Sequence, residues 1–284
     1  MKFGATFPTH EIGTDPGAVR AFAQAAEGLG FDYLVAIDHV LGIDRARHPD
    51  YAPIEASEPR YFLDYPYHEL FVLFGFLAAV TARVGLVTGV LVLPQRQTTL
   101  VAKQAAEVDL LSGGRLTLGI GVGHTDIESR GMGTDHRTRG RRIEEQVQVL
   151  RALWTTPSVT FRGEFHDLDG VGINPRPLRA IPIWMGGWST PVLDRAARLA
   201  DGLMMPRRRA EMIDLLTRHG RDPSTFGFSD TVVLGDRDDD AVTEVRAAGE
   251  RGITHLAVNG QSTGRQTCDE HIAVLERFKA IAGV

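Results

Sequence analysis

The chain has 284 residues, 43% of them hydrophobic and 24% charged, so it is long and apolar enough to bury one large core. Its formal net charge of −5 and isoelectric point near 6.1 disfavour nucleic acid and anionic membranes as partners. The single cysteine, Cys268, excludes an internal disulfide framework and is typical of a reducing cytoplasm. We therefore expect one globular domain over residues 1–284, with a small-molecule substrate as its partner.

No targeting or membrane-spanning segment is expected. Met1–Pro8 has the pattern of a short strand that ends in proline, and it lacks the charged-then-apolar order of a signal peptide. The longest apolar run, Leu70–Val80, is shorter than the roughly 20 residues that cross a bilayer. These two features predict a soluble, cytoplasmic protein.

The segment Val84–Gly123 has the clearest secondary-structure signal. Val84–Leu93 and Leu116–Val122 are apolar runs typical of strands that are buried on both faces. The residues between them predict a helix that Thr98 or Thr99 caps. The apolar stripe of this helix consists of Leu100, Val101, Ala105, Val108 and Leu111, and Gly113 is expected to end it in the left-handed conformation. The segment therefore predicts two parallel strands joined by a right-handed crossover.

The same alternation continues along the chain. Further strands are expected at Lys2–Phe7, Tyr33–Ile37, Pro182–Met185, Gly202–Met205, Phe228–Leu234 and His255–Val258. Further helices are expected after Asp15–Pro16, at Leu70–Thr81 and Arg139–Trp154, and near 190–200, 208–219, 238–251 and 268–282. Eight strands alternating with helices predict an α/β fold of the closed (β/α)8 TIM-barrel class rather than an open doubly wound sheet.

Three segments do not fit the barrel repeat. Residues 42–66 form a long, charged and aromatic segment with four prolines, which we interpret as a lid or a substrate wall. His124–His136 is polar and contains two glycines, and it is predicted to be a loop. Val159–Phe161 and Glu164–Leu168 are predicted to pair as an inserted hairpin.

Candidate catalytic residues follow the strands, because the active site of a β/α barrel lies at the carboxyl ends of its strands. Asp38 and His39 follow the second predicted strand, and a histidine beside a carboxylate can donate a hydrogen bond or move a proton near neutral pH. The alternative is that His39 only supports its loop. His10 and His124 follow the first and fourth predicted strands. The three histidines could converge, but no close pair of histidines or cysteines indicates a metal site.

The segment Gly186–Pro191 favours anion binding. Two glycines leave the fifth predicted strand and Pro191 opens a helix, whose first N–H groups and positive dipole end suit a phosphate. A well-capped helix with nothing bound is the alternative. Arg207–Arg209, after the next strand, favour an anion because they could reach it from the neighbouring loop.

The glycines of the fourth predicted strand do not indicate a dinucleotide site. Gly119, Gly121 and Gly123 are spaced as G-x-G-x-G and lie partly within the strand. We interpret them as places where a cofactor or a neighbouring strand approaches closely. A G-x-S-x-G nucleophile motif is absent from the sequence, so acyl transfer is not indicated.

Several ordered motifs of this chain resemble the luciferase-like monooxygenase superfamily, and most closely its branch of bacterial oxidoreductases that use the deazaflavin coenzyme F420. The motifs are Leu77–His124, Arg139–Thr155, Phe161–Val171 and Pro175–Met204. The resemblance covers most of the chain up to about Pro206, and the residues beyond it only follow in order.

The resemblance implies a barrel whose rim holds an isoalloxazine-type ring. Asp38 and His39 would lie beside the ring, and His39 would contact the ring or the substrate. Gly89-Val90 corresponds to a non-proline cis peptide that relatives carry under the ring. The residues expected to bind the cofactor are Asp38, His39, Gly89, Val90, Gly121, Gly186, Gly187, Trp188, Ser189 and Arg207. Among them, Gly186–Ser189 would hold the cofactor phosphate.

One position departs from the deazaflavin dehydrogenases, which place a proton-donating glutamate after the fourth strand. This chain has His124 there, with Asp126 and Glu128 close behind. The candidate catalytic residues are therefore Asp38, His39 and His124, and no metal ligands are expected.

Three functional interpretations stay open. The leading one is hydride transfer between C5 of F420 and a small organic substrate. The second is an FMN-dependent monooxygenase on the same barrel, because the ring pockets of the two classes are alike. The third is a cofactor-binding barrel with little catalysis, because one fold serves many functions. Relatives in the superfamily are often homodimers, so a homodimer is also expected.

Overall fold

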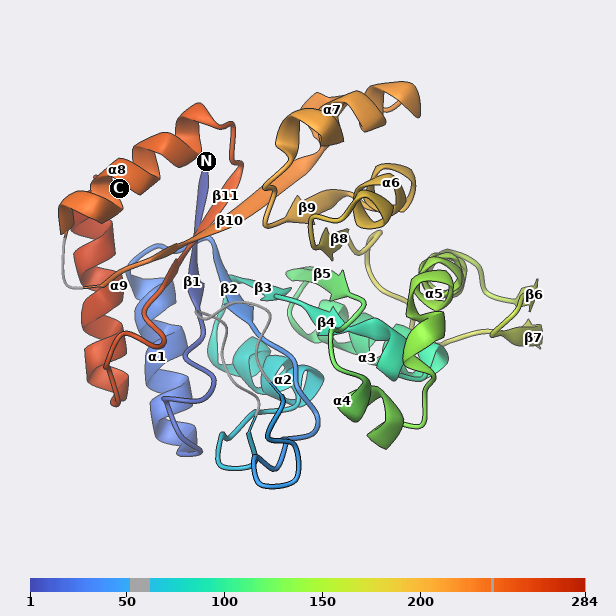
Figure 1. Ribbon diagram of the computed structural model, residues 1–284, viewed down its shortest axis with the longest axis horizontal. Helices are drawn as coiled ribbons and strands as arrows, with labels where there is room; N and C mark the ends of the chain where they lie inside the picture. Colours follow the sequence, from blue (N-terminus) through green and yellow to red (C-terminus); the bar gives the residue numbers. More distant parts are fainter. Residues whose placement is uncertain (52–61, 236–237, 284) are drawn as a thin grey trace.

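The computed structural model describes residues 1–51, 62–235 and 238–283 (Figure 1). Within these residues, eight parallel strand positions close into a barrel, because the last strand pairs with the first. Around the barrel the order is β1 (Lys2–Thr6), β2 (Tyr33–Ala36), β3 (Gly85–Thr88), β5 (Leu116–Gly121), β8 (Ile183–Gly186), β9 (Gly202–Met204), β10 (Gly227–Val233) and β11 (His255–Asn259). This order confirms the predicted (β/α)8 barrel.

The third strand position is broken in two. A cis peptide bond joins Gly89 to Val90 between β3 and the short β4 (Leu91–Val92). It lies where the resemblance implies one. β4 pairs with the end of β5, so both halves of the strand stay within the barrel wall.

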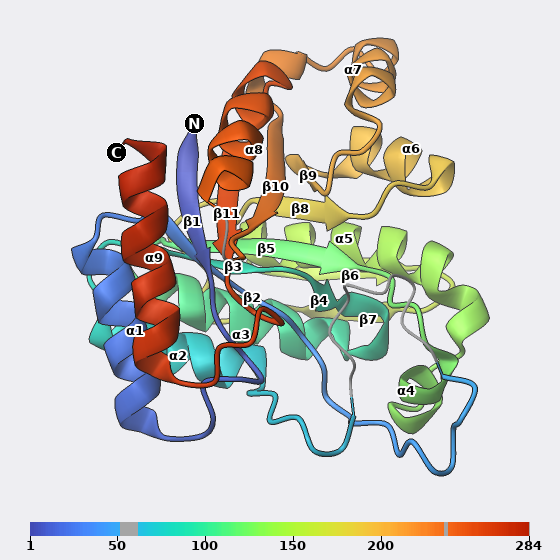
Figure 2. The same cartoon turned by 60° about the vertical axis from the view of Figure 1, so that its left-hand side comes forward.

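Helices alternate with the strands, and all of them except the short α4 cover the outside of the barrel. They are α1 (Pro16–Gly28), α2 (Leu70–Val80), α3 (Thr98–Leu111), α4 (Asp126–Gly131), α5 (Arg139–Thr155), α6 (Thr190–Leu199), α7 (Arg209–Arg218), α8 (Asp238–Glu250) and α9 (Cys268–Ala282). Short 3₁₀ helices cover Leu93–Gln95, His136–Thr138 and Pro223–Thr225. Figures 1 and 2 show α1 and α9 side by side, so the first and last helices pack against each other.

Local hydrogen bonds explain where helices begin and end. The Asp15 carboxylate accepts hydrogen bonds from the N–H groups of Gly17 at 3.0 Å and Ala18 at 3.3 Å, which confirms the predicted start of α1. Gly113 has a φ of +73° after α3, as predicted for a residue that ends a helix in the left-handed conformation.

The predicted cap and stripe of α3 are partly wrong. Gln97 is the residue before the helix, and the Thr98 hydroxyl contacts Nε2 of His166 at 2.5 Å instead of capping. Leu100 and Leu111 are 51% and 70% exposed. The buried face is shifted toward Ala102 and other small residues, because α3 packs closely against its neighbours α2 and α5.

Two insertions leave the barrel. His124–His136 is not a plain loop, because it contains α4, which lies beyond the arrowheads of β4 and β5 in Figure 2. The predicted hairpin is present as β6 (Val159–Arg162) and β7 (Asp167–Val171), and it projects beyond α5 in Figure 1.

Apolar side chains pack in two places. The larger core lies between the strands and the helices and includes Phe22, Leu34 and Phe74. A smaller cluster fills the barrel interior and includes Tyr33 and Trp184. Among the described residues, none of the helices is both long and apolar enough to cross a membrane. The single-domain organisation, the homodimer and the cytoplasmic location stay predictions.

Candidate active site

The structure gathers the predicted site residues at one rim of the barrel, because the parallel strands all end there. Asp38 and His39 follow β2, Gly89 and Val90 follow β3, and Arg207 follows β9. Gly121 is the last residue of β5, and His124 comes three residues later. Gly186 is the last residue of β8, and Gly187–Ser189 follow it. We call this end of the barrel the carboxyl rim.

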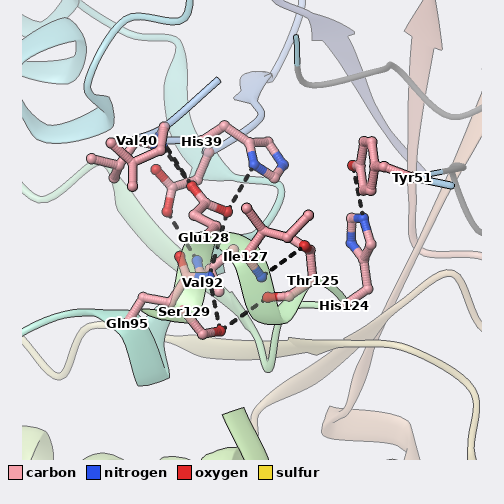
Figure 3. A network of polar contacts seen from close by, with 12 residues as sticks. His39, Val40, Tyr51, Val92, Gln95, His124, Thr125, Ile127, Glu128 and Ser129 are labelled. Atoms are coloured by element: carbon pink, nitrogen blue, oxygen red, sulfur yellow. Dashed lines mark hydrogen bonds and ion pairs between the residues drawn. The ribbon is translucent and has the colours of Figure 1, made fainter. Parts of the chain in front are cut away.

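A buried pair of His39 and Glu128 is the centre of the carboxyl rim (Figure 3). Nδ1 of His39 lies 3.1 Å from Oε2 of Glu128, which comes from α4. The other oxygen, Oε1, accepts hydrogen bonds from the N–H of Val40 at 2.8 Å and of Leu41 at 3.3 Å. One carboxylate therefore fixes both the imidazole ring and the backbone that follows it.

The charge of Glu128 determines how His39 is protonated. Burial alone would raise the pKa of Glu128, but the hydrogen bonds from His39 and from two backbone N–H groups outweigh burial and lower it. An ionised carboxylate only accepts hydrogen bonds, so Nδ1 of His39 carries the proton of this contact. In the neutral ring, Nε2 then has the lone pair.

Asp38 is buried beside His39, but its carboxylate is engaged with the protein. Arg96 donates to Oδ1 at 2.7 Å, and the N–H of Val92 donates to Oδ2 at 3.0 Å. Arg96 also donates to Glu69 at 2.7 Å. Burial alone would lower the pKa of Arg96, but the two carboxylates outweigh burial and raise it. Asp38 therefore ties the end of β2 to the end of the third strand.

His124 lies opposite His39, with 6.4 Å between the two ring centroids. Its Nε2 atom lies 3.3 Å from the hydroxyl of Tyr51, and the two rings are nearly parallel. Tyr51 belongs to the segment 42–66 that was interpreted as a substrate wall. Residues 52–61 of that segment lie outside the described part of the chain.

A second histidine–carboxylate cluster lies next to the first. Glu11 lies 3.1 Å from Nε2 of His271 and 3.5 Å from Nε2 of His10. Burial opposes the ionisation of Glu11, but hydrogen bonds from His10, His271 and a backbone N–H lower its pKa to about 2. The ring of Tyr67 lies 6.2 Å from His10 and 5.5 Å from His39, between centroids, so it links the two clusters.

Val90 forms a half-buried apolar floor at the rim. A Cβ atom at Gly121 would lie 2.5 Å from Cγ2 of Val90, and one at Gly186 would lie 2.7 Å from Cγ1. Glycine at both positions is therefore what lets Val90 lie between β5 and β8. The side chain of Val90 therefore forms an apolar surface at the rim.

The amino end of α6 lies beside this floor and is surrounded by arginine. The N–H groups of Ser189 and Thr190 make no hydrogen bond within the described ranges. Arg208 donates to the carbonyl oxygen of Trp188 at 3.2 Å and to Oγ1 of Thr190 at 3.0 Å. The guanidinium of Arg207 lies 4.2 Å from the centre of the Trp188 ring. Arg208 also forms an ion pair with Glu211 at 2.5 Å, so its charge is shared between this carboxylate and the helix amino terminus. The arginines and the two N–H groups can together hold an anion.

Sequence reasoning missed the roles of Glu128, Arg96 and Tyr67. Thr125 and Glu128 have the spacing of a capping box, which could have predicted α4, and Thr125 does accept a hydrogen bond from the N–H of Ile127. Nothing in the sequence signals the contacts of Arg96 or Tyr67. Across 1–51, 62–235 and 238–283, no cluster of three His, Cys, Asp or Glu side chains is placed to hold a metal ion.

Comparisons with known proteins identify the family of the chain. A model of the luciferase-like monooxygenase family matches residues 1–279. An uncharacterized protein of Mycobacterium tuberculosis is 38% identical over 64% of this chain and 62% of its own length. An FMNH2-dependent dimethylsulfone monooxygenase of Pseudomonas fluorescens is 32% identical, over 64% of this chain and 46% of its own length. An F420-dependent glucose-6-phosphate dehydrogenase of Kineococcus radiotolerans is 33% identical, over 66% of this chain and 51% of its own length.

The matched segments thus span less than two thirds of these relatives. Among solved structures, an F420-dependent secondary alcohol dehydrogenase in complex with an F420–acetone adduct has a TM-score of 0.77 at 17% identity, and covers 99% of this chain and 98% of its own. A monooxygenase of Streptomyces bottropensis has a TM-score of 0.75 at 21% identity with the same coverage. These two structures share the fold. This chain belongs to the luciferase-like monooxygenase family.

Proposed function

We propose that this protein is an F420-dependent oxidoreductase that interconverts a small alcohol and the corresponding carbonyl compound. The observation that carries the proposal is the buried His39–Glu128 pair beside the apolar Val90 floor. One relative and one solved structure with this fold are F420-dependent dehydrogenases by name, and the alternative, FMN-dependent monooxygenation, is the activity of a relative of similar identity.

The residues of the carboxyl rim fit a planar ring with an anionic tail. Val90 offers the ring an apolar face between two glycines. The N–H groups of Ser189 and Thr190, with Arg208, offer donors to a phosphate. The tail of F420 has carboxylates in addition to its phosphate, so neighbouring Arg207 favours F420 over FMN. When bound, the deazaflavin supplies the C5 carbon that accepts or gives the hydride.

His39 is the residue that moves the substrate proton in this proposal. With Nδ1 donating to Glu128, Nε2 of the neutral ring can take the hydroxyl proton of an alcohol. In the reverse direction the protonated ring returns that proton to the carbonyl oxygen. Glu128 stabilises the imidazolium form because it is an adjacent, buried negative charge. Asp38, whose carboxylate is bound to Arg96, acts as a positioning residue rather than as a catalyst.

The walls around His39 are aromatic and polar. His124 and Tyr51 form one wall, and Tyr67 with His10 forms another. These groups offer hydrogen bonds as well as ring faces, so we propose a small, polar substrate. His124 is placed to hydrogen-bond a substrate oxygen across from His39.

Titration of the apoprotein with each cofactor tests the proposal. We expect the dissociation constant of F420, followed by its fluorescence, to be at least about tenfold lower than that of FMN. Arg208→Gln should weaken F420 by about tenfold, because it removes a charge-assisted donor, whereas the exposed Arg137→Gln should leave it unchanged.

A panel of small alcohols then tests the reaction. The proposal predicts that at least one alcohol reduces bound F420, measured as loss of its absorbance. Tighter binding of FMN, with oxygen consumption in the presence of FMNH2, would instead support the monooxygenase. If neither cofactor binds, the proposed function is wrong.

A further inference from the structure

A second chamber lies at the opposite end of the barrel from the carboxyl rim. It has a volume of about 540 Å³ and is lined by the first residues of several strands, among them Lys2, Tyr33, Gly85 and His255. We call it the amino-end chamber. Its size lies within the roughly 300–1,000 Å³ of small-molecule pockets. None of the residues assigned above to the cofactor or to His39 lines it.

The charge of the amino-end chamber is positive, although the whole chain is acidic. Its lining includes the cations Lys2, Arg83, Arg115 and Arg179 but a single carboxylate, Asp32. Asp32 already accepts a hydrogen bond from the N–H of Phe3 at 2.7 Å.

Three of these cations form no direct ion pair in the described residues, although the charge of Glu27 acts on Arg83 and Arg115 from nearby. Within the described part of the chain, no carboxylate lies within ion-pair distance of Lys2, Arg83 or Arg115. The carboxylate of Glu27 lies next to this wall, where it accepts hydrogen bonds from the backbone N–H groups of Ala82, Arg83 and Val84. Arg115 donates only to carbonyl and hydroxyl oxygens, so its positive charge is retained at the chamber wall.

The inner wall of the amino-end chamber is aromatic. The centroid of His255 lies 4.7 Å from that of Trp184 and 5.7 Å from that of Tyr33. Trp184 has room for its ring because Gly202 and Gly227 face it, where a Cβ atom would lie 2.4 Å and 2.3 Å from the indole. The three rings together form a surface suited to a flat apolar body.

Hydroxyl groups also line this space. Tyr33 is 5% exposed, and its hydroxyl lies beside Ser229 at the chamber wall. Ser229 and Thr117 add further hydroxyls to the same lining.

We propose that the amino-end chamber binds a small aromatic carboxylate, with its ring against Trp184 and Tyr33 and its carboxylate toward Lys2 and Arg83. The excess of cations in the lining favours an anion, and the three aromatic rings favour a planar body. This site is separate from the cofactor site and does not depend on which cofactor the carboxyl rim binds.

Calorimetric titration of the apoprotein with benzoate tests this site. We expect one benzoate per chain, and at least about tenfold weaker binding of benzamide, which keeps the ring but lacks the charge. Acetate, which keeps the charge but lacks the ring, should also bind at least about tenfold more weakly. Equal binding of benzamide, or no binding of benzoate, would overturn the proposal.

Variants locate the binding. Lys2→Gln and Arg83→Gln should each raise the dissociation constant of benzoate by about tenfold with an unchanged melting temperature, and Arg137→Gln, on an exposed surface, should not change it. Crystals soaked with 4-iodobenzoate should show the iodine beside Trp184. If Lys2→Gln and Arg83→Gln both bind benzoate as tightly as the wild-type chain, the proposal is overturned. Iodine found only at the carboxyl rim would overturn it as well.

Discussion

The two ends of the barrel differ in how their charged side chains are compensated. At the carboxyl rim, the carboxylates of Asp38, Glu128 and Glu11 each have a cation or an imidazole within 3.5 Å. At the amino end, the Arg115 guanidinium contacts only neutral oxygens and the Arg179 guanidinium lies 3.4 Å from the buried Asp109. The two cations that we expect to attract a ligand at the amino end are Lys2 and Arg83, which form no direct ion pair within the described residues. We therefore expect the carboxyl rim to hold reacting groups in a fixed geometry and the amino end to bind an anion.

The largest expected effect is at the centre of the carboxyl rim. His39→Ala should lower turnover by about 10²–10⁴-fold, because it removes the proposed proton carrier. His219→Ala, which changes an exposed histidine paired with Asp194 on α6, is the matched control and should keep normal turnover. Steady-state kinetics with F420 and the best alcohol would measure both. Near-normal turnover of His39→Ala would remove His39 from the mechanism.

The Asp38–Arg96 pair tests whether the rim depends on paired charge for its stability. Arg96→Met should lower the free energy of unfolding by about 3–5 kcal/mol, because it leaves Asp38 buried without its cation. The exposed pair of Arg130 and Asp126 is the control, and Arg130→Met should cost less than about 1 kcal/mol. Urea denaturation measures both changes. Similar costs for the two variants would contradict the contrast between buried and exposed pairs.

Glu128→Gln distinguishes positioning from catalysis. We expect turnover to fall by about 10–100-fold, because a neutral amide no longer stabilises the imidazolium of His39. The pH profile of turnover should also change, because the substitution removes a buried negative charge beside the proposed proton carrier. A variant with lower turnover but an unshifted profile would show that Glu128 only supports the fold.

The smallest effect concerns His255 at the amino end. Burial, and then the nearby charge of Lys2, lower the pKa of His255 to about 4, below its ordinary value of 6.5. The unfolded chain therefore takes up a proton between pH 6.5 and pH 4 that the folded chain does not, so the folded state loses stability as the pH falls through this range. After allowance for partial exposure, the loss should be about 1–2 kcal/mol.

His255→Asn isolates this contribution. The variant should lack the part of the stability loss that falls between pH 6.5 and pH 4, measured as the difference from the wild-type chain in urea denaturation at each pH. The loss due to Glu11 falls at lower pH, because its pKa is lowered from 4.5 to about 2. Parallel curves for the two proteins over the upper range would contradict the assignment.

The sequence predicted the barrel well because its strands are largely buried and therefore rich in apolar residues. Its predictions were weaker wherever tertiary contacts decide. Thr98 contacts His166 from the inserted hairpin, and Leu100 is exposed although it is apolar. The strand ends indicated Asp38 and His39, but their partners Arg96 and Glu128 lie 58 and 89 residues away along the chain, so no local pattern links them.

The amino-end chamber had no sequence signal. Its cations come from the starts of different strands, and its aromatic residues alternate with residues that face the helices. Periodicity identifies which strand positions are apolar, but it does not say which of them surround an open space. Only the closed barrel brings Lys2, Arg83 and Trp184 to one chamber.

The central claim is that the carboxyl rim, and not the amino end, holds the redox cofactor. A crystal structure of the protein with F420 tests this claim most directly. The account predicts the ring stacked on Val90 beside His39, with the phosphate at the N–H groups of Ser189 and Thr190. A ring bound in the amino-end chamber against Trp184, or away from Val90, would contradict it.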